Sequence, residues 1–244
     1  MRRILKIAKA ELFTLFYSPV AWLILVAFTV QVGLKFTGLM ADFVYREDIG
    51  FGNGFLTANL LGGMFGMYNT VQQYLYLYMP LLTMGLMSRE FSSGSIKLLY
   101  SSPVTSSQII MGKFLAMMAY GLVLLGTLIL YIGYAACVVD NFAFAEALSG
   151  LLGLYLLLCA FAAIGLFVSC LTSYQVVAAV ATLGALAFLN YVGRMGQEVP
   201  FIRDITYWLS ISGRSDELIN GLISSEDVFY FLIVIGLFLT LSIM

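Results

Sequence analysis

The pair Gly112-Lys113 is the part of this chain that comes nearest to a phosphate-binding motif. A P-loop needs the pattern G-x-x-x-x-G-K-[ST], in which backbone N–H groups cradle the phosphates and the hydroxyl ligates Mg²⁺. Here Ser107 stands where the first glycine is required, and Phe114 follows the lysine. The pair therefore fails as a nucleotide site, and we expect this chain neither to bind nor to hydrolyse ATP.

Other side chains that commonly do chemistry are scarce. The chain has no histidine, which removes the commonest general base and metal ligand. Cys137, Cys159 and Cys170 lie in apolar runs and lack C-x-x-C spacing, so we expect neither a disulfide framework nor a metal site. No Ser–His, Cys–His or paired-carboxylate arrangement occurs in the apolar runs. We therefore expect no catalytic residue in this chain.

The composition indicates which elements must position the remaining polar residues. Of the 244 residues, 61% are hydrophobic and 10% are charged, whereas soluble domains are about 45–50% apolar and about 25% charged. Leu, Ala, Gly and Phe come in long runs, which indicates membrane-spanning helices. We predict a single all-α transmembrane domain over residues 1–244. The net charge of −1 does not suggest a nucleic-acid partner.

Six apolar runs are candidates to cross a bilayer, which needs about 17–25 helical residues. The second run is the least regular, because Gln72 and Gln73 open it and Pro80, which removes a backbone hydrogen bond, is expected to kink it. The six runs are 20–40, 72–87, 113–139, 148–171, 175–192 and 228–244.

Basic residues are distributed unevenly among the connecting segments, in the sense of the positive-inside rule. With a cytoplasmic N-terminus, the inner segments hold Arg2, Arg3, Lys6, Lys9, Arg89, Lys97 and Lys113, and the outer ones Arg46, Arg194, Arg203 and Arg214. We therefore predict that both termini are cytoplasmic and that segments 41–71 and 193–227 face outward. The N-terminal run is expected to stay as an uncleaved anchor. The natural chain either ends at Met244 or continues beyond it.

Lys35 is the clearest ionisable residue inside a predicted span. Charges in the membrane are rare and often functional. Lys35 lies toward the outer end of its span, so its ammonium either snorkels to the surface or lines a transport pathway. Gln31 lies one turn away on the same helix face and is placed for either role. Because buried charge is otherwise so scarce, the sequence argues against an ion-coupled carrier.

Residues 2–16 form an amphipathic pattern that is typical of a helix in the headgroup plane. Lys6 and Lys9 lie on the basic face, and Ser18-Pro19 ends the helix. This elbow helix is either a simple anchor or a contact for a cytoplasmic partner. Glu11, at the edge of the apolar face, caps the helix, pairs with a basic neighbour or faces a partner. The apolar face holds Ile4, Leu5, Ala8, Leu12, Leu15 and Phe16.

The inner segment 88–113 reads SREFSSGSIKLLYSSPVTSSQIIMGK. Ser92-Ser93-Gly94 is a turn signal, and Ser101-Ser102-Pro103 stops the short apolar piece 96–100. Residues 105–108 fit a capping box, so a second helix is expected to start near Ser106 and run into the third span. The apolar side chains of a rigid helix at the inner surface must be shielded from water by another molecule. Lipid headgroups and a groove on a soluble partner are equally compatible with the residues.

Three stretches of the chain resemble ABC-2-type (type V) ABC transporter permeases. They are REFSSGSIKLLYSSPVTSSQIIMGKF at 89–114, IGLFVSCLTSYQVVAA at 164–179 and LSISGRSDELINGLISSEDVFYFL at 209–232. The last two are similar to the branch that contains gliding-motility and copper-enzyme-maturation permeases. The order and spacing of the three stretches fit along nearly the whole chain.

The resemblance implies a six-span ABC-2 fold in the bacterial cytoplasmic membrane. It also implies that segment 88–113 carries a coupling helix that docks on a cytosolic ABC ATPase dimer, and that ATP and Mg²⁺ bind to that partner, with no cofactor in this chain. A second copy of the chain or a related permease would complete the transporter. The residues implied in coupling are Glu90, Gly94, Ile96, Lys97, Leu98, Leu99, Tyr100 and Pro103.

The fifth span carries small residues at a spacing that permits close helix packing: Ala178, Ala181, Gly184 and Ala185. They serve packing within the chain or a subunit interface. In the outer segment 193–227, the stretch FIRDITYWL forms either a re-entrant or interfacial helix or a plain loop. Two functions remain open: an exporter permease for an amphipathic, lipid-linked or polymeric substrate, and a force transmitter that drives an extracytoplasmic partner.

Overall fold

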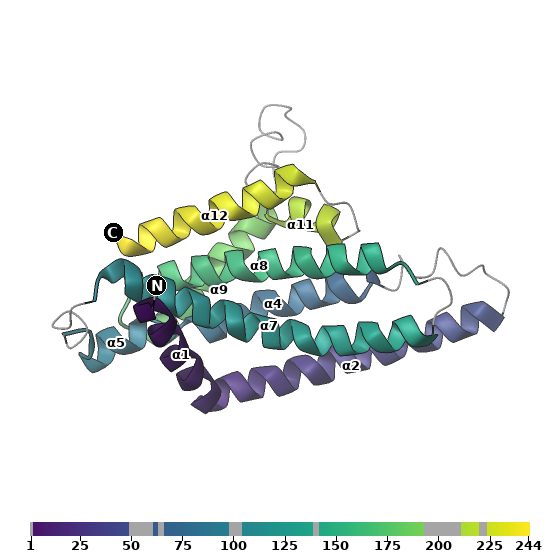
Figure 1. Ribbon diagram of the computed structural model, residues 1–244, viewed down its shortest axis with the longest axis horizontal. Coiled ribbons are helices and arrows are strands. Elements are labelled where there is room, and N and C mark those ends of the chain that lie inside the picture. The colour runs from purple at the N-terminus through teal and green to yellow at the C-terminus, as the bar shows by residue number, and fades with distance from the viewer. Residues whose placement is uncertain are drawn as a thin grey trace.

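The structure, a computed structural model, describes residues 2–48, 61–62, 66–97, 104–138, 142–192, 211–219 and 224–244. Every regular element in these ranges is a helix, and most of the helices run side by side along one long axis (Figure 1). The helices are α1 Arg2–Tyr17, α2 Pro19–Asp48, α4 Met67–Thr83, α5 Ser88–Ser93, α7 Ser106–Val138, α8 Phe144–Leu171, α9 Gln175–Val192, α11 Ile211–Ile219 and α12 Ser225–Ile243.

Five helices are long and apolar enough to cross a membrane, which confirms five of the predicted spans. The longest, α7, has 33 residues and extends for about 50 Å at about 1.5 Å per residue, well beyond a hydrocarbon core of about 30 Å. One end of α7 therefore projects from the bilayer. The five spans are Pro19–Asp42 within α2, Ser106–Val138, Phe144–Leu171, Gln175–Val192 and Ser225–Ile243.

Helix α4 is shorter than the five candidate spans, and it begins and ends earlier than the run predicted for it. It has 17 residues, from Met67 to Thr83, with Pro80 in its last turn. The predicted end at Met87 was wrong, because the apolar run continues for four residues after the helix has ended at Thr83. Leu86 and Met87 are indeed buried, but in the turn that follows the helix. At 17 residues, α4 is about 25 Å long, so a sixth full span stays a prediction.

Helix α8 occupies the centre of the bundle. It contacts α4, α7, α9, α11 and α12, and Figure 1 shows it running between α12 and α7. Between helices in lipid the attraction comes from close packing rather than from the hydrophobic effect. Glycines on α8 permit this contact: a Cβ on Gly150 would lie 2.2 Å from the ring of Tyr68 on α4. The Tyr68 hydroxyl donates to the Ala147 carbonyl at 2.8 Å.

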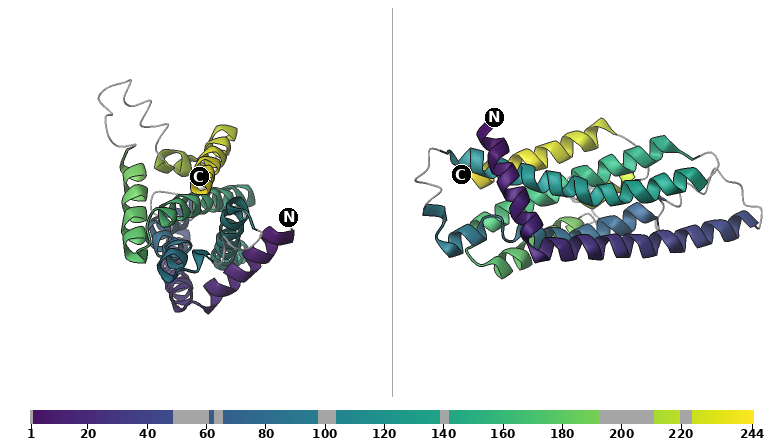
Figure 2. Two further views of the ribbon diagram at one scale, coloured as in Figure 1. Left: turned by 90° about the vertical axis from the view of Figure 1, so that its left-hand side faces the viewer. Right: turned by 60° about the horizontal axis from the view of Figure 1, so that its bottom comes forward.

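Helix α1 lies across one end of the bundle rather than along it (Figure 2). Leu15 is buried, and Leu12 and Phe16 pack against the core, so the predicted apolar face is largely covered by protein. Leu5, assigned to the same face, is instead 62% exposed. The face was misplaced because Ile7 also points inward, against Gly112 of α7. Lys6 and Lys9 are exposed.

Helix α11, in the predicted outer segment, is tied to its neighbours by buried polar contacts. Arg214 Nη1 lies 2.9 Å from Asp227 Oδ1 on α12, and both side chains are 3% exposed. The Ser149 hydroxyl on α8 donates to the Leu218 carbonyl at 3.1 Å, and the Gln72 amide on α4 donates to the Ser215 hydroxyl at 3.0 Å. The stretch 201–209, for which a re-entrant helix was considered, lies outside the described residues.

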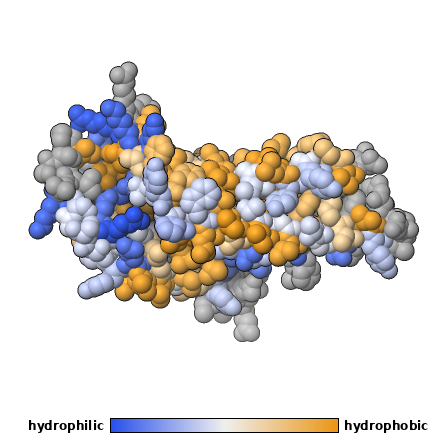
Figure 3. Space-filling view, turned by 90° about the horizontal axis from the view of Figure 1, so that it is seen from below, coloured by the Kyte–Doolittle hydropathy of each residue, from blue (hydrophilic) through white to orange (hydrophobic). Residues whose placement is uncertain are grey.

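The surface polarity follows the long axis. Hydrophilic residues gather at the end that holds α1 and α5, and hydrophobic residues cover most of the middle (Figure 3). A middle zone of this kind matches the hydrocarbon part of a bilayer. The polar end, where α1, α5 and the start of α7 meet, is where charged side chains can approach one another without entering the hydrocarbon.

Candidate functional site

Three charged side chains converge where α1, α5 and α7 meet. Lys113 Nζ on α7 lies 2.6 Å from Glu11 Oε1 on α1 and 2.6 Å from Glu90 Oε1 on α5. The Lys113 side chain is 2% exposed, whereas those of Glu11 and Glu90 are 21% and 18% exposed. We call these three residues the Lys113 triad. It joins three helices through one buried cation.

The charge balance of the Lys113 triad makes it costly to open. Taking an ammonium out of water costs several kcal/mol, which only close opposite charges and hydrogen bonds offset. Two carboxylates surround the single ammonium, and Glu90 Oε2 is buried without a hydrogen-bond partner among the described residues. Separating α1 or α5 from α7 would expose this imbalance. The triad therefore favours movement of the three helices as one unit.

Gly112 brings α1 close enough for the Lys113 triad to form. A Cβ at this position would lie 2.6 Å from Ile7 Cγ2 and 3.4 Å from the Ile4 carbonyl oxygen. Any larger residue would therefore push α1 away from α7 and lengthen the Glu11–Lys113 contact. The pair Gly112-Lys113, which fails as a phosphate-binding motif, thus has a structural role: the glycine admits α1 and the lysine binds it.

Ser169 on α8 fixes the turn that leads from α4 into α5. Its hydroxyl oxygen accepts from the backbone N–H groups of Met87 at 3.0 Å and Ser88 at 3.1 Å. The same hydroxyl donates to the Met84 carbonyl at 3.0 Å. One side chain thus satisfies three buried backbone groups in an irregular segment, where a helix or strand ladder cannot do so. The position of α5, and hence of Glu90, depends on it.

Replacing Ser169 with alanine is expected to destabilise the chain by about 1–3 kcal/mol, the cost of leaving buried polar groups without partners. Thermal unfolding of the purified protein in detergent measures this. Ser242→Ala is the matched control, because the Ser242 hydroxyl bonds only the Phe238 carbonyl of its own helix. Equal unfolding temperatures for the two variants would show that Ser169 does not hold the turn.

A comparison with protein families decides what kind of bundle this is. A family profile described as "ABC-2 family transporter protein" matches residues 5–243. The chain belongs to the ABC-2 transporter family. It is therefore a multi-pass membrane permease, of a family whose members are typically non-catalytic membrane subunits that work with a cytosolic ABC ATPase. No curated protein matches the chain.

The coupling segment of this ABC-2 permease is partly described. Gly94 ends α5 in the left-handed conformation, with φ 71°, as its place in a turn signal predicts. Ile96 is half-buried and packs against the permease core, and Lys97 is exposed. Glu90 lies in the Lys113 triad, where it binds a residue of this chain. Leu98, Leu99, Tyr100 and Pro103 lie outside the described residues.

Helix α7 of the permease begins at Ser106, as predicted. The predicted capping box does not form. Thr105 Oγ1 lies 3.1 Å from the Ser107 hydroxyl, and Gln108 Oε1 has no hydrogen-bond partner among the described residues. The Gln108 N–H instead donates to the Thr105 carbonyl at 2.9 Å. A tight first turn formed by the backbone therefore takes the place of the side-chain cap.

Of the two residues considered for a pathway, Gln31 serves helix packing. Its side-chain oxygen accepts from the Tyr78 hydroxyl, which connects α2 to α4. Lys35 is half-buried, and in the described ranges it makes no ion pair. Neither residue belongs to the lining of the cavities found among the described residues at the polar end. A role of Lys35 in transport stays a prediction.

The small residues of α9 divide between two faces. Ala178 is buried, and Ala185 packs against the core, so both serve contacts within the chain. Ala181 and Gly184 are exposed, and a Cβ on Gly184 would meet no atom within 4 Å. These two residues are therefore placed to face lipid or a second subunit.

Sequence reasoning missed the roles of Lys113, Gly165 and Ser169. Lys113 was considered only as part of a phosphate-binding pair and in the charge count, although Glu11 was considered as a partner for a basic neighbour, and this was a usable signal. Gly165 lets α8 approach Thr83 at the end of α4, where a Cβ would lie 2.2 Å from the Thr83 hydroxyl. Within the described ranges, no cluster of three metal-ligating side chains occurs.

Proposed function

We propose that this chain is the permease subunit of an ATP-driven exporter and that α1 and α5 transmit movement from a separate cytosolic ATPase to the spans. The Lys113 triad is the observation that carries the proposal. It links the segment nearest the proposed ATPase surface to α7, a span 33 residues long. A rigid link of this kind passes on displacement without bending.

The proposed route begins at the coupling segment. Movement of α5 would pull Glu90, and with it Lys113, because breaking the contact leaves buried charges unpaired. The turn held by Ser169 would carry the same movement to α8, the central helix. The spans would then open toward the outer side for an amphipathic, lipid-linked or polymeric substrate. A complete transporter would contain this chain twice, or once with a related permease, and the exposed side of α9 is a candidate interface.

A finer family assignment is part of the same proposal. We propose membership of the branch that contains gliding-motility and copper-enzyme-maturation permeases, on the similarity of residues 164–179 and 209–232. The first of these stretches contains Gly165 and Ser169, which contact the end of α4 and the turn into α5. This part of α8 therefore has a mechanical role in the proposed mechanism.

Substitution of Leu98 tests the docking of the ATPase. Leu98→Asp is expected to abolish capture of the ATPase and stimulation of its hydrolysis. The change removes apolar burial worth roughly 1.5–3 kcal/mol and places an unpaired charge in the contact. The measurement is co-purification in mild detergent, which also identifies the ATPase, followed by hydrolysis with and without the permease.

Two controls make the Leu98 experiment decisive. Ser92→Asp adds the same charge at an exposed position of the same segment and is expected to leave capture unchanged. The purified permease without its partner is expected to hydrolyse no ATP. Normal capture and turnover in Leu98→Asp, in protein that inserts normally, would place the coupling segment against lipid and refute the proposal.

The proposed orientation has its own test. In a chain whose native cysteines are replaced, a single cysteine at Ser106 is expected to resist an impermeant reagent in whole cells and to react after permeabilisation. A single cysteine at Asp48 is expected to react in whole cells, because the basic residues place segment 41–71 outside. The opposite pattern would invert the topology.

A further inference from the structure

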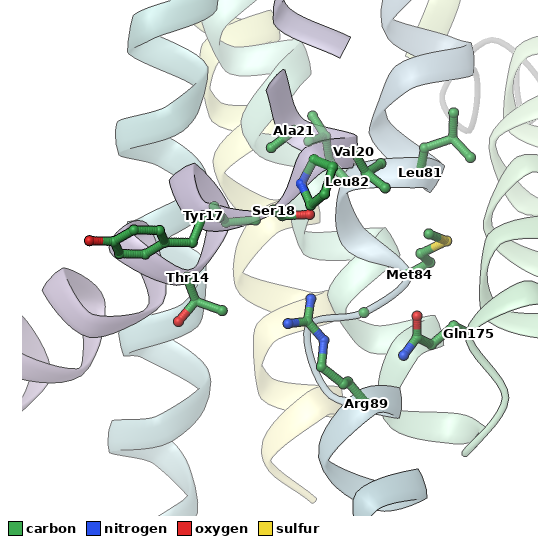
Figure 4. Close-up of a pocket in the computed structure, with 13 residues that line it drawn as sticks. Thr14, Tyr17, Ser18, Val20, Ala21, Leu81, Leu82, Met84, Arg89 and Gln175 are labelled. Carbon is green, nitrogen blue, oxygen red and sulfur yellow. The ribbon is translucent and has the colours of Figure 1, made fainter. Parts of the chain in front are cut away.

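A cavity of about 360 Å³ lies beside the Lys113 triad, between the α1–α2 corner, the end of α4 and the start of α9. Its polar lining comes from Thr14, Ser18, Arg89 and Gln175, and its apolar lining includes Val20 and Leu81. Figure 4 shows the Arg89 side chain rising from α5 into this space, below Ser18 and Leu82 and beside Gln175. Elements far apart in the sequence thus build one site.

Among the described residues that line this cavity, Arg89 is the only charged one. Within the described ranges, its guanidinium makes no ion pair and no hydrogen bond, and neither do the Ser18 hydroxyl and the Gln175 amide. Gly85 leaves room for the guanidinium, because a Cβ there would lie 3.2 Å from Arg89 Nη2. A planar cation, a hydroxyl and an amide therefore share a cavity that supplies no anion.

The chemistry of the lining selects a phosphate group. Guanidinium groups bind phosphate oxygens in pairs, through two parallel N–H donors. The free hydroxyl of Ser18 and the amide of Gln175 add donors around the same space. A carboxylate would use the guanidinium as well, but a tetrahedral phosphate can engage several donors that approach from different elements.

The other side of the cavity is apolar, and this favours a lipid over a free anion. Val20, the second residue of α2, is 40% exposed, and Leu81 near the end of α4 is 37% exposed. Both therefore face the surroundings at the border between the polar end and the hydrophobic middle of the bundle. A free phosphate would leave this wall uncovered, whereas a phospholipid would place its acyl chain along it.

We propose that this cavity binds an anionic phospholipid, with the phosphate on Arg89, Ser18 and Gln175 and an acyl chain along Val20 and Leu81. Exposed basic residues of α1, such as Lys6 and Lys9, lie at the same end and attract anionic headgroups. Arg89 also lines a smaller cavity of about 170 Å³ next to the Lys113 triad. The lipid would therefore brace α5 against the α1–α2 corner.

The test uses the purified full-length chain in detergent and needs no ATPase, so it can fail or succeed independently of the proposed function. Phosphatidylglycerol is added, and binding is read by native mass spectrometry and by the rise in unfolding temperature. Phosphatidylcholine and inorganic phosphate are the comparison ligands. The expected result is stabilisation and retention with phosphatidylglycerol alone.

Arg89→Gln is expected to weaken phosphatidylglycerol binding at least about tenfold, as loss of a charge-assisted hydrogen bond implies. Arg89→Lys keeps the charge without the paired donors and is expected to bind at an intermediate strength. Lys97→Gln removes an equal charge from an exposed site outside the cavity and is expected to bind normally. The lipid-free unfolding temperature of each variant shows that it is folded.

Three results would overturn the lipid site. Equal stabilisation by inorganic phosphate would make it a site for free phosphate. An equal loss of binding in Lys97→Gln would reduce the effect to general surface charge. Normal phosphatidylglycerol binding by Arg89→Gln would show that the guanidinium does not hold a lipid phosphate.

Discussion

Replacing Lys113 with methionine is expected to destabilise the permease by about 3–5 kcal/mol, the range measured when one partner of a buried ion pair is removed. The change leaves Glu11 and Glu90 facing each other with their carboxylates largely buried and no cation between them. The repulsion between the two carboxylates is expected to move α5 away from α1, so stimulation of a partner ATPase is expected to fail as well.

Thermal unfolding in detergent measures the Lys113 effect, with Lys97→Met as the control because Lys97 is exposed. The combined variant Glu11→Gln, Glu90→Gln, Lys113→Met removes every charge of the triad. It is expected to recover most of the lost stability, since neutral replacements of buried ion clusters are often tolerated. If Lys113→Met unfolds at the wild-type temperature, the triad does not hold the three helices together.

Replacing Asp227 with alanine is expected to cost a similar amount, about 3–5 kcal/mol. Arg214 and Asp227 are each 3% exposed and lie 2.9 Å apart, so removing the carboxylate leaves a guanidinium buried beside the ring of Tyr230. Helix α11 is then expected to detach from α12. The end of the bundle that holds α11 should loosen while the Lys113 triad stays intact.

Hydrogen exchange followed by mass spectrometry locates the Asp227 effect: peptides from α11 should exchange faster, and those from α1 and α5 should not. Glu226→Ala is the matched control, because Glu226 is the preceding residue on the same helix and is exposed. The double variant Arg214→Met, Asp227→Leu is expected to be more stable than Asp227→Ala. Unchanged protection of α11 in Asp227→Ala would show that other contacts suffice to hold it.

The sequence alone determined the class of the protein and most of its helices. Long apolar runs require a membrane and a helix that satisfies its own backbone, so five spans could be placed within a few residues. Helix ends that depend on neighbouring residues in the sequence were also predicted correctly: Gly94 ends α5, and α7 begins at Ser106. The motif in 89–114 pointed to the family that the profile match shows.

Predictions failed where tertiary packing, rather than local sequence, decides the outcome. The end of α4 was placed too late, because Leu86 and Met87 are apolar yet lie in a turn that Ser169 holds from α8. The inward face of α1 was misjudged, because Gly112 on α7 admits Ile7. In both cases the deciding atom belongs to another helix.

The candidate site itself came only from the tertiary structure. Glu11 and Glu90 meet Lys113 across sequence separations of 102 and 23 residues. Hydropathy and periodicity describe one helix at a time, so they assign a lysine near the end of a span to the membrane surface. Whether that lysine is solvated or shared by two carboxylates depends on which helix ends the fold brings together, because a buried charge persists only where its partners are already in place.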